Sequence, residues 1–260
     1  MRVNYLFFNL LFKRMFKKLI LIISGLLLFT SASFSQKKKA ALPFDKNNVP
    51  LVRCATEQRV QMLFRAFPER KLLAEKLAKI VPDNKSLRMA KRMESIVYLP
   101  VVFHIVLPNP YLITDQVIAS EINVMNTDFG GLNADSTNIP AAFQAVRGHS
   151  QIRFILAKRT PDGKLTDGID RVYSSTTGNP NNIVDSIKRS SLGGADAWDP
   201  ASYINIWVGK TSNDEGVLGY TQIPGSGSLQ DDGVFCNILG FGVSDCNVCI
   251  YNKGRTVVHE

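Results

Sequence analysis

The sequence has little apolar length to offer a membrane. Its N-terminal apolar stretch, residues 19–29, is 11 residues long, whereas a transmembrane helix needs about 20. No cysteine lies near the end of this stretch, which excludes a lipid anchor there. Residues 1–35 contain five basic side chains and no acidic ones, and small residues follow the apolar stretch. This pattern is typical of a secretory signal peptide, with cleavage expected before Gln36.

The signal peptide predicts a secreted or periplasmic protein that keeps no membrane attachment once the signal is removed. The pattern is complete from Met15 onward, so Met15 is an alternative translation start to Met1. The composition shows no bias toward disorder, and 260 residues suffice for one large domain or two small ones.

Acidic side chains are scarce in the first third of the chain. Residues 36–96 carry 15 lysines and arginines against 6 acidic residues, whereas residues 97–260 carry 11 against 16. A net charge of +9 would suggest a nucleic-acid partner if basic residues covered the whole protein. The larger part is acidic, however, so we expect no nucleic-acid partner. The two parts carry opposite charge and are expected to attract each other.

Only four cysteines are present, Cys54, Cys236, Cys246 and Cys249. In an exported protein, clustered cysteines form disulfides more often than metal sites. Cys236, Cys246 and Cys249 are therefore disulfide candidates, and we favour a bridge within their own loop. Because three cysteines cannot all pair with one another, one of them pairs with Cys54, stays unpaired, or pairs outside the 260 residues. The alternative is a structural Cys₃His zinc site that includes His259.

Hydrophobic periodicity predicts helices in the basic part of the chain. Residues 56–80 carry apolar side chains at helical spacing, with Thr56 as the expected N-cap. Pro68 interrupts the pattern and is expected to divide it into two helices. After residue 95 the composition changes from basic and polar to rich in β-branched residues. This change predicts a boundary between a basic segment at 36–95 and a domain at 96–260.

The second part reads as a sheet with helices. A continuous β-branched run at residues 96–107 is typical of a buried strand, and a helix capped by Thr114 or Asp115 follows it. Further strands are expected at residues 152–158, 203–209, 217–224 and 233–243, and a short helix at 181–190. The order predicts an α/β (mixed α+β) fold, with one mixed sheet and helices packed on it.

Seven segments occur in an order and spacing that match one known family. They read LPVVFHIVL, ITDQVIASEINVMNTDFGGLNAD, IRFILAKRTPDGKLTDGIDR, AWDPASYINIWVG, LGYTQIP, DDGVF and GRTVVHE. Together they resemble the catalytic domain of the pappalysin family of secreted metzincin metallopeptidases, and its ulilysin-like bacterial members in particular. The resemblance covers residues 97–260. It implies a metzincin-like upper subdomain, with a twisted mixed sheet, a backing helix and the start of the active-site helix.

The resemblance also implies zinc as the cofactor and peptide-bond hydrolysis as the reaction. In the family, the active-site helix carries H-E-x-x-H-x-x-G-x-x-H, so His259 corresponds to the first zinc ligand and Glu260 to the general base. A catalytic zinc is held by three protein ligands and activates a water. The other two histidines have no counterpart before the chain stops. We therefore expect an endopeptidase precursor acting on protein or peptide substrates, cut off within its motif and inactive as given.

The family's bacterial members carry an inhibitory cysteine in a pro-segment. Cys54, beside Arg53, corresponds to it, which implies a helical pro-segment at 36–95 whose thiolate takes the fourth zinc position. Family members have Cys-Gly where this chain has Ala55 after the cysteine, so the match is imperfect, and a disulfide through Cys54 is the alternative. Lys91 and Arg92 offer a cleavage site for maturation, or belong to a solvated basic helix.

Three further features have two interpretations each. By resemblance, the edge strand at Leu218, Gly219 and Tyr220 would pair with the substrate backbone; otherwise it is an ordinary edge strand. The Asp-Asp-Gly stretch at 231–233 offers a calcium ligand set or a plain turn. His104, inside an apolar strand, is either a core histidine or a ligand, and we expect a core histidine. For the whole chain, the alternative function is a non-catalytic secreted module that binds peptides or inhibits relatives through its pro-segment.

Overall fold

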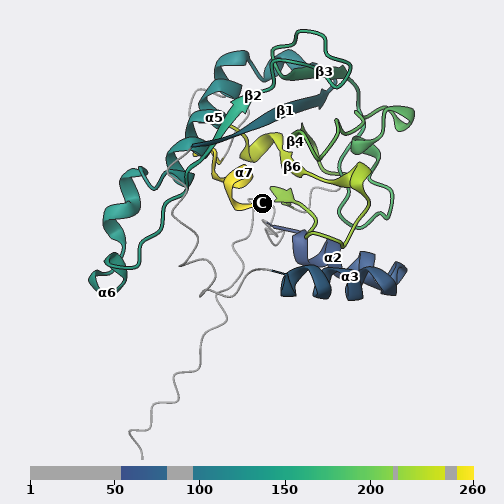
Figure 1. The fold of residues 1–260 in the computed structure, drawn as a ribbon. Helices are drawn as coiled ribbons and strands as arrows, with labels where there is room; N and C mark the ends of the chain where they lie inside the picture. The colour runs from purple at the N-terminus through teal and green to yellow at the C-terminus, as the bar shows by residue number, and fades with distance from the viewer. Residues whose placement is uncertain (1–53, 81–95, 213–215, 244–250) are drawn as a thin grey trace, which may run out of the picture. The chain divides into compact units, whose positions relative to one another are not determined.

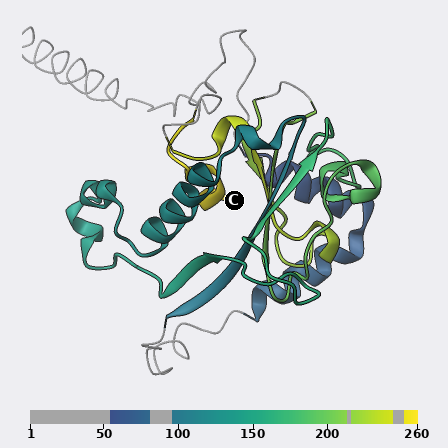
Figure 2. The ribbon, with the colours of Figure 1, turned by 90° about the horizontal axis from the view of Figure 1, so that it is seen from above.

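Strand β1 (Val97–Leu107) lies inside the sheet and pairs with three other strands (Figures 1 and 2). The computed structural model describes residues 54–80, 96–212, 216–243 and 251–260, all within the compact unit Pro43–Glu260. The predicted signal peptide, the Lys91 and Arg92 cleavage site, and the loop cysteines Cys246 and Cys249 lie outside the described residues. Within the described ranges, no helix is both long and apolar enough to cross a membrane.

The sheet is mainly parallel. The first half of β1 pairs with β2 (Ile152–Leu156) and its second half with β3 (Ile169–Tyr173), while its other side pairs with β4 (Ile204–Gly209). The remaining strands are β6 (Val234–Asn237), parallel to β4, and β5 (Gly219–Tyr220), antiparallel to β6 at the edge. The mixed α/β fold expected from the sequence is confirmed. Strand β3 was not expected, because its sequence IDRVY lacks a run of buried apolar residues.

The predicted edge strand at 217–224 is much shorter than expected. Only Gly219 and Tyr220 join the ladder. The next amide, that of Thr221, donates instead to the hydroxyl of Thr56 (2.9 Å). A contact from a distant part of the chain therefore ends the strand, which no local pattern could indicate.

Helix α5 (Asp115–Phe129) covers one face of the sheet, as predicted, and Thr114 caps it by accepting from the amide of Val117. Its buried residues Val117, Ile118 and Met125 pack against alternate side chains of β1 and β4, and the short helix α7 (Arg255–His259) joins the same core through Val257. Figure 2 shows α5 and α7 together on this side of the sheet. Hydrophobic burial over this face is the main force that places α7, since five residues are too few for a stable isolated helix.

The opposite face buries Trp207, Tyr220 and Phe235 beneath irregular chain. The helix expected at 181–190 is absent there. Two 3₁₀ turns, η3 (Ser186–Lys188) and η4 (Ser190–Leu192), replace it. Side chains explain the difference. The carboxylate of Asp185 accepts from the Tyr220 hydroxyl (2.7 Å), and the ammonium of Lys188 donates to two backbone carbonyls. Both side chains point inward, a pattern that helical periodicity does not reveal.

The N-terminal helical segment (residues 54–80) consists of α2 (Thr56–Ala66) and α3 (Pro68–Lys79), so the division at Pro68 is confirmed. The predicted cap at Thr56 is wrong: Ala55 is the N-cap residue and no side chain caps this helix. Ala55 is 1 % exposed and belongs to the core of the second sheet face. The remaining short elements are η1 (Pro110–Leu112), η2 (Ala134–Asn138), α6 (Ala141–Gln144), η5 (Leu229–Asp231) and η6 (Ile238–Gly240).

Candidate active site

Helix α7 carries His259 and is followed at once by Glu260. It begins after Gly254, whose φ of 63° places it in the left-handed region that favours glycine. The Arg255 guanidinium pairs with Asp128 at the end of α5 (2.9 Å) and with Asp135. These contacts, with the buried Val257, fix the direction in which the helix presents its last turn.

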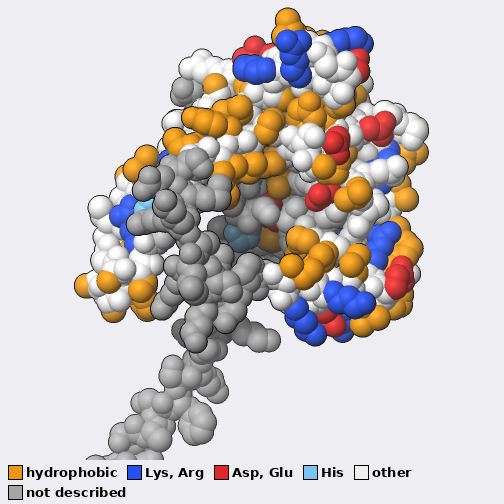
Figure 3. Space-filling model, in the orientation of Figure 1, with side chains coloured by type: hydrophobic (Ala, Val, Ile, Leu, Met, Phe, Trp, Pro, Cys, Tyr) orange, Lys and Arg blue, Asp and Glu red, His pale blue; other side chains and the backbone are white. Residues whose placement is uncertain are grey.

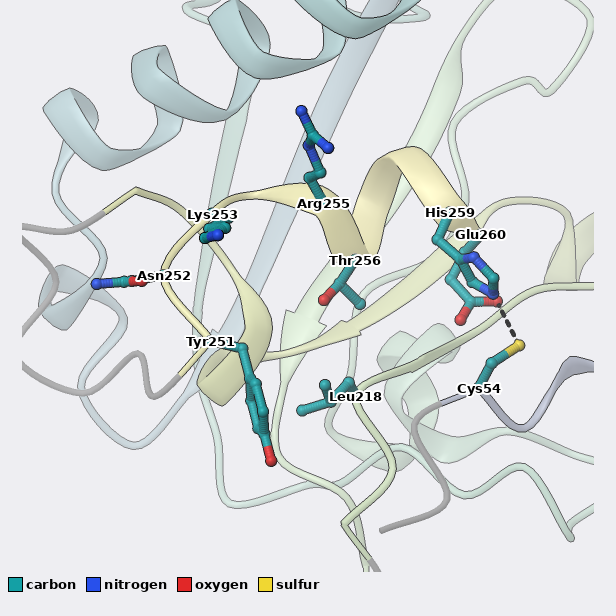
Figure 4. A pocket seen from close by; sticks show the side chains of 9 residues that line it. All are labelled: Cys54, Leu218, Tyr251, Asn252, Lys253, Arg255, Thr256, His259 and Glu260. Carbon is teal, nitrogen blue, oxygen red and sulfur yellow. Dashed lines mark hydrogen bonds between the residues drawn. The ribbon is translucent and has the colours of Figure 1, made fainter. Parts of the chain in front are cut away.

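Three side chains from the two ends of the described chain meet at that last turn. A sulfur of Cys54, a ring nitrogen of His259 and a carboxylate oxygen of Glu260 all lie within 4.8 Å of one another. The Cys54 thiol donates to Glu260 Oε2 over 3.3 Å (Figure 4). The family resemblance implies that these three residues share one site, and in the structure their side chains do lie together.

Thr56 makes a further contact with this cluster. Its hydroxyl donates to Glu260 Oε2 (2.7 Å) and accepts from the amide of Thr221 (2.9 Å). The other carboxylate oxygen, Glu260 Oε1, is buried and has no hydrogen-bond partner among the described residues. Sequence reasoning missed the role of Thr56, because a threonine before a helical run normally suggests a cap.

The edge strand lies directly beneath the cluster. Cys54 forms a parallel bridge with Gly219, and the amide of Ala55 donates to the Gly219 carbonyl (3.0 Å). A Cβ added at Gly219 would lie 2.8 Å from Cγ of Glu260 and 3.0 Å from Cγ2 of Thr256. Only a glycine lets α7 approach the edge strand this closely.

The electrostatics of the cluster favour a neutral thiol. Burial raises the pKa of Cys54, and the negative charge of Glu260 adds to this, while hydrogen bonds from Thr56 act in the opposite direction. The thiol therefore keeps its proton and can donate it to the carboxylate, as the geometry shows. A nearby divalent cation would reverse this preference, because metal coordination deprotonates a thiol.

A cavity of about 490 Å³ opens over the cluster. In Figure 3 the surface is hollowed where α7 and β5 lie, and Figure 4 shows the side chains on its wall. The lining residues are Cys54, Leu218, Tyr251, Asn252, Lys253, Arg255, Thr256, His259 and Glu260. Of the three edge-strand residues expected to meet substrate, Leu218 reaches this cavity with its side chain. The Tyr220 side chain is fully buried on the other face.

The remaining sequence candidates lie elsewhere. His104 is a core histidine, as predicted: it is fully buried, stacks on Trp207 with ring centroids 5.0 Å apart, and faces Asp170 and Asn205 at 3.0 Å each. Cys236 is a free, fully buried thiol in β6, as Cys54 is also free, so the structure shows no disulfide through either of them.

The possible calcium ligand Asp231 is occupied by other partners. Its carboxylate pairs with Arg189 (3.0 Å) and accepts from the hydroxyl of Ser228 (2.8 Å). Asp231 is also only 4 % exposed. The 231–233 stretch is therefore a buried ion-pair site in this structure, which the sequence pattern of two adjacent acids did not indicate.

Among the solved structures that match this chain are structures of mirolysin and promirolysin. Mature mirolysin of Tannerella forsythia, in complex with a cleaved peptide, is 38 % identical with a TM-score of 0.58 over 64 % of this chain and 62 % of its own. A point mutant of promirolysin from the same organism is 34 % identical, with a TM-score of 0.64 over 80 % of this chain and 66 % of its own. The chain belongs to the pappalysin family of metzincin metallopeptidases.

Membership of the pappalysin family agrees with the fold and with the position of His259 and Glu260 beside the edge strand. A second mirolysin structure, in complex with a compound, is 39 % identical with a TM-score of 0.57. The chain spans about 62 % of the length of these two mirolysin structures. No protein-family model and no curated protein sequence matches the chain.

Proposed function

We propose that the chain is the N-terminal portion of a secreted zinc-dependent metalloendopeptidase precursor. Residues 1–35 are a signal peptide, residues 36–95 an inhibitory pro-segment, and residues 96–260 the first part of the catalytic domain. The observation that carries this proposal is the meeting of Cys54, His259 and Glu260 above an edge strand. The promirolysin structure supports the pro-segment, since it matches 80 % of this chain against 64 % for mature mirolysin.

The donor set of the cluster suits zinc. A thiolate and an imidazole are the ligands that zinc takes most often, and the unpartnered Glu260 Oε1 is the kind of buried oxygen that a cation would satisfy. When bound, zinc polarises the scissile carbonyl and acidifies a water. His259 and Cys54 would hold it here.

Zinc binding by this chain alone is expected to be weak. The sequence contains three histidines, but His104 is enclosed in the sheet and His149 lies in an exposed loop. One histidine therefore remains for a site that needs three protein ligands for catalysis. We propose that the 260-residue chain has no proteolytic activity by itself.

Glu260 would serve as the general base, accepting a proton from water at its carboxylate. In the observed state Cys54 and Thr56 both donate to Oε2 of this carboxylate. An oxygen that already accepts two hydrogen bonds is a poor proton acceptor, so the N-terminal segment occupies one of the two carboxylate oxygens of the base as well as a metal position. Activity then requires removal of residues 54 and 56 from the site.

The substrate would pair with the edge strand by β-augmentation. The carbonyl of Gly219 is the acceptor on that edge, and it is already used by the amide of Ala55. The N-terminal helical segment therefore occupies the position that a peptide substrate needs. Leu218, on the cavity wall, would contact a substrate side chain, while Tyr220 would contribute its backbone.

Metal titration of the purified chain tests this proposal. Cobalt(II), a spectroscopic substitute for zinc, should bind weakly and show a sulfur-to-metal charge-transfer band that is lost in Cys54→Ser. His259→Ala should weaken binding further, and the matched control His149→Ala should leave it unchanged. Binding that is insensitive to both Cys54 and His259 contradicts the site. Chelator-sensitive cleavage of casein by the purified chain contradicts the proposed inactivity.

A further inference from the structure

Arg59 is completely buried, although it lies on a short helix at the surface of the sheet. Its exposed fraction is 0 %, whereas Arg65 on the same helix is exposed. Arginine is almost never fully buried unless it is paired. The contacts of Arg59 therefore point to a specific site, distinct from the cysteine-histidine-glutamate cluster.

Three separate parts of the sheet domain (residues 96–260) surround the Arg59 guanidinium, and we call these surroundings its pocket. Its Nη1 donates to the carbonyl of Asn182 (3.1 Å). Its Nη2 lies 4.0 Å from Oδ1 of Asp231, a carboxylate whose side chain is 6 % exposed. Its central carbon stands 5.6 Å from the centre of the Tyr220 ring. A carbonyl, a carboxylate and an aromatic face are the three partners that a planar guanidinium prefers.

The fixed charges around the pocket are nearly balanced when Arg59 is present. Asp185 and Asp231 are the buried acids, and Asp232 is a third carboxylate near Lys188. With Lys188 and Arg189 as the other cations, three positive charges face three negative ones. Burial lowers the pKa of Lys188 to about 8, which means that the charged form of this side chain is destabilised by its loss of contact with water. Removal of Arg59 takes one positive charge from a group that contains two buried carboxylates.

The fit between Arg59 and its pocket is incomplete. Its Nε and Nη2 atoms have no hydrogen-bond partner among the described residues. Oδ1 of Asp231, which lies 4.0 Å from Nη2, is closer to the guanidinium of Arg189, at 3.0 Å. A buried cation with unmade hydrogen bonds is held less tightly than a fully bonded one. Such a contact suits a side chain that must leave the pocket when the segment is released.

We propose that this pocket is a guanidinium-binding site on the sheet domain, which Arg59 fills in cis. The site anchors the first turns of α2 independently of any metal, and its ligand class is the arginine side chain. The role in latency rests on the proposed function, but the binding site itself does not, since none of its residues belongs to the cysteine-histidine-glutamate cluster. Once the segment is removed, the pocket is open to an arginine of another peptide.

The rate at which a maleimide alkylates Cys54 tests the anchor. The purified full chain is labelled in EDTA, and each cysteine is read separately by peptide mass spectrometry. Arg59→Ala should accelerate labelling of Cys54 by about tenfold or more, the effect expected from loss of a charge-assisted hydrogen bond. The matched control Arg65→Ala should label at the unchanged rate. The fully buried Cys236 reports whether a variant has unfolded globally.

Chemical rescue tests the class of ligand. Ethylguanidinium added to Arg59→Ala should slow Cys54 labelling toward the original rate, whereas ethylammonium at the same concentration should not. If Arg59→Ala also exposes Cys236, the milder Arg59→Lys replaces it, and its Cys54 should label faster than in the unaltered chain with Cys236 still protected. An unchanged Cys54 rate in these variants, or equal rescue by the two cations, overturns the proposal. Because EDTA removes metals, neither result depends on zinc at His259.

Discussion

The hydroxyl of Thr56 donates a hydrogen bond of 2.7 Å to the carboxylate of Glu260, 204 residues further along the chain. The same hydroxyl accepts from the amide of Thr221, where the edge strand ends. One small side chain thus connects the N-terminal helical segment, the edge strand and the end of α7. Cys54 and Arg59 lie two residues before and three residues after it, so the segment holds the sheet domain at three successive points.

Replacing Thr56 by valine should loosen the end of α7. Valine has nearly the same side-chain shape as threonine, but Glu260 Oε2 loses a hydrogen-bond donor and the Thr221 amide loses an acceptor. A hydrogen bond to a charged group contributes about 1.5–3 kcal/mol. We expect faster amide exchange in α7 and at Thr221, measured by hydrogen–deuterium exchange, with β1 unchanged. Thr56→Ser keeps the hydroxyl and should behave like the unaltered protein. Equal exchange in the valine and serine variants would show that the bond has no influence.

Gly219→Ala should separate the edge strand from α7. The added Cβ would lie 2.8 Å from Cγ of Glu260, closer than real side chains approach. Such overpacking typically costs about 1–3 kcal/mol, measurable as a lower midpoint in urea unfolding. Gly148→Ala is the matched control, because a Cβ there meets no atom within 4 Å. A variant with unaltered stability and unaltered Cys54 labelling would contradict the close packing of Glu260 on the strand.

The sequence was sufficient to predict the elements whose apolar residues repeat at a regular spacing. The β-branched run at 96–107 and the stripe through Val117, Ile118 and Met125 both became what their periods indicate. Pro68 divided the N-terminal helices for a local steric reason. For His259 and Glu260 the family resemblance predicts a zinc ligand and a general base, whereas a dipeptide alone predicts no chemistry.

Buried polar side chains were the main source of error. Asp185 and Lys188 point inward and replace the expected helix at 181–190 by two 3₁₀ turns. Arg59 occupies a helix position that its charge would assign to the surface. Each of these side chains contacts at least one partner more than 30 positions away, and such partners cannot be identified from local propensity.

Arg255 should govern how firmly α7 is held against α5. Its ion pairs with Asp128 and Asp135 join the two helices, and a five-residue helix depends on such tertiary contacts. Because the Arg255 side chain is 42 % exposed, we expect Arg255→Met to cost only about 1 kcal/mol. Amide exchange should accelerate in α7 while α5 stays protected. The neighbouring exposed Lys253→Met is the control, and equal effects of the two changes would contradict a specific role for Arg255.

The buried carboxyl of Glu121 should make the stability of the protein depend on pH. Glu121 lies on α5, is 0 % exposed, and accepts a hydrogen bond from the amide of Gly242 (2.9 Å). Burial raises its pKa from 4.5 to about 8, with a smaller contribution from the charge of Asp128 and an opposing one from the Gly242 amide. Between these two pH values the folded protein holds a proton that the unfolded chain has released.

Stability should therefore fall as pH rises through this window, because the unfolded state binds fewer protons there. The contribution is fully present below pH 4.5, and it is lost progressively until about pH 8. For one proton the slope cannot exceed about 1.4 kcal/mol per pH unit. Glu121→Gln preserves the acceptor for Gly242 and removes the titration, so its free energy of unfolding should change less with pH and exceed that of the unaltered protein near pH 8. Urea unfolding across the window measures both slopes, and parallel curves for the two proteins would exclude Glu121 as the titrating group.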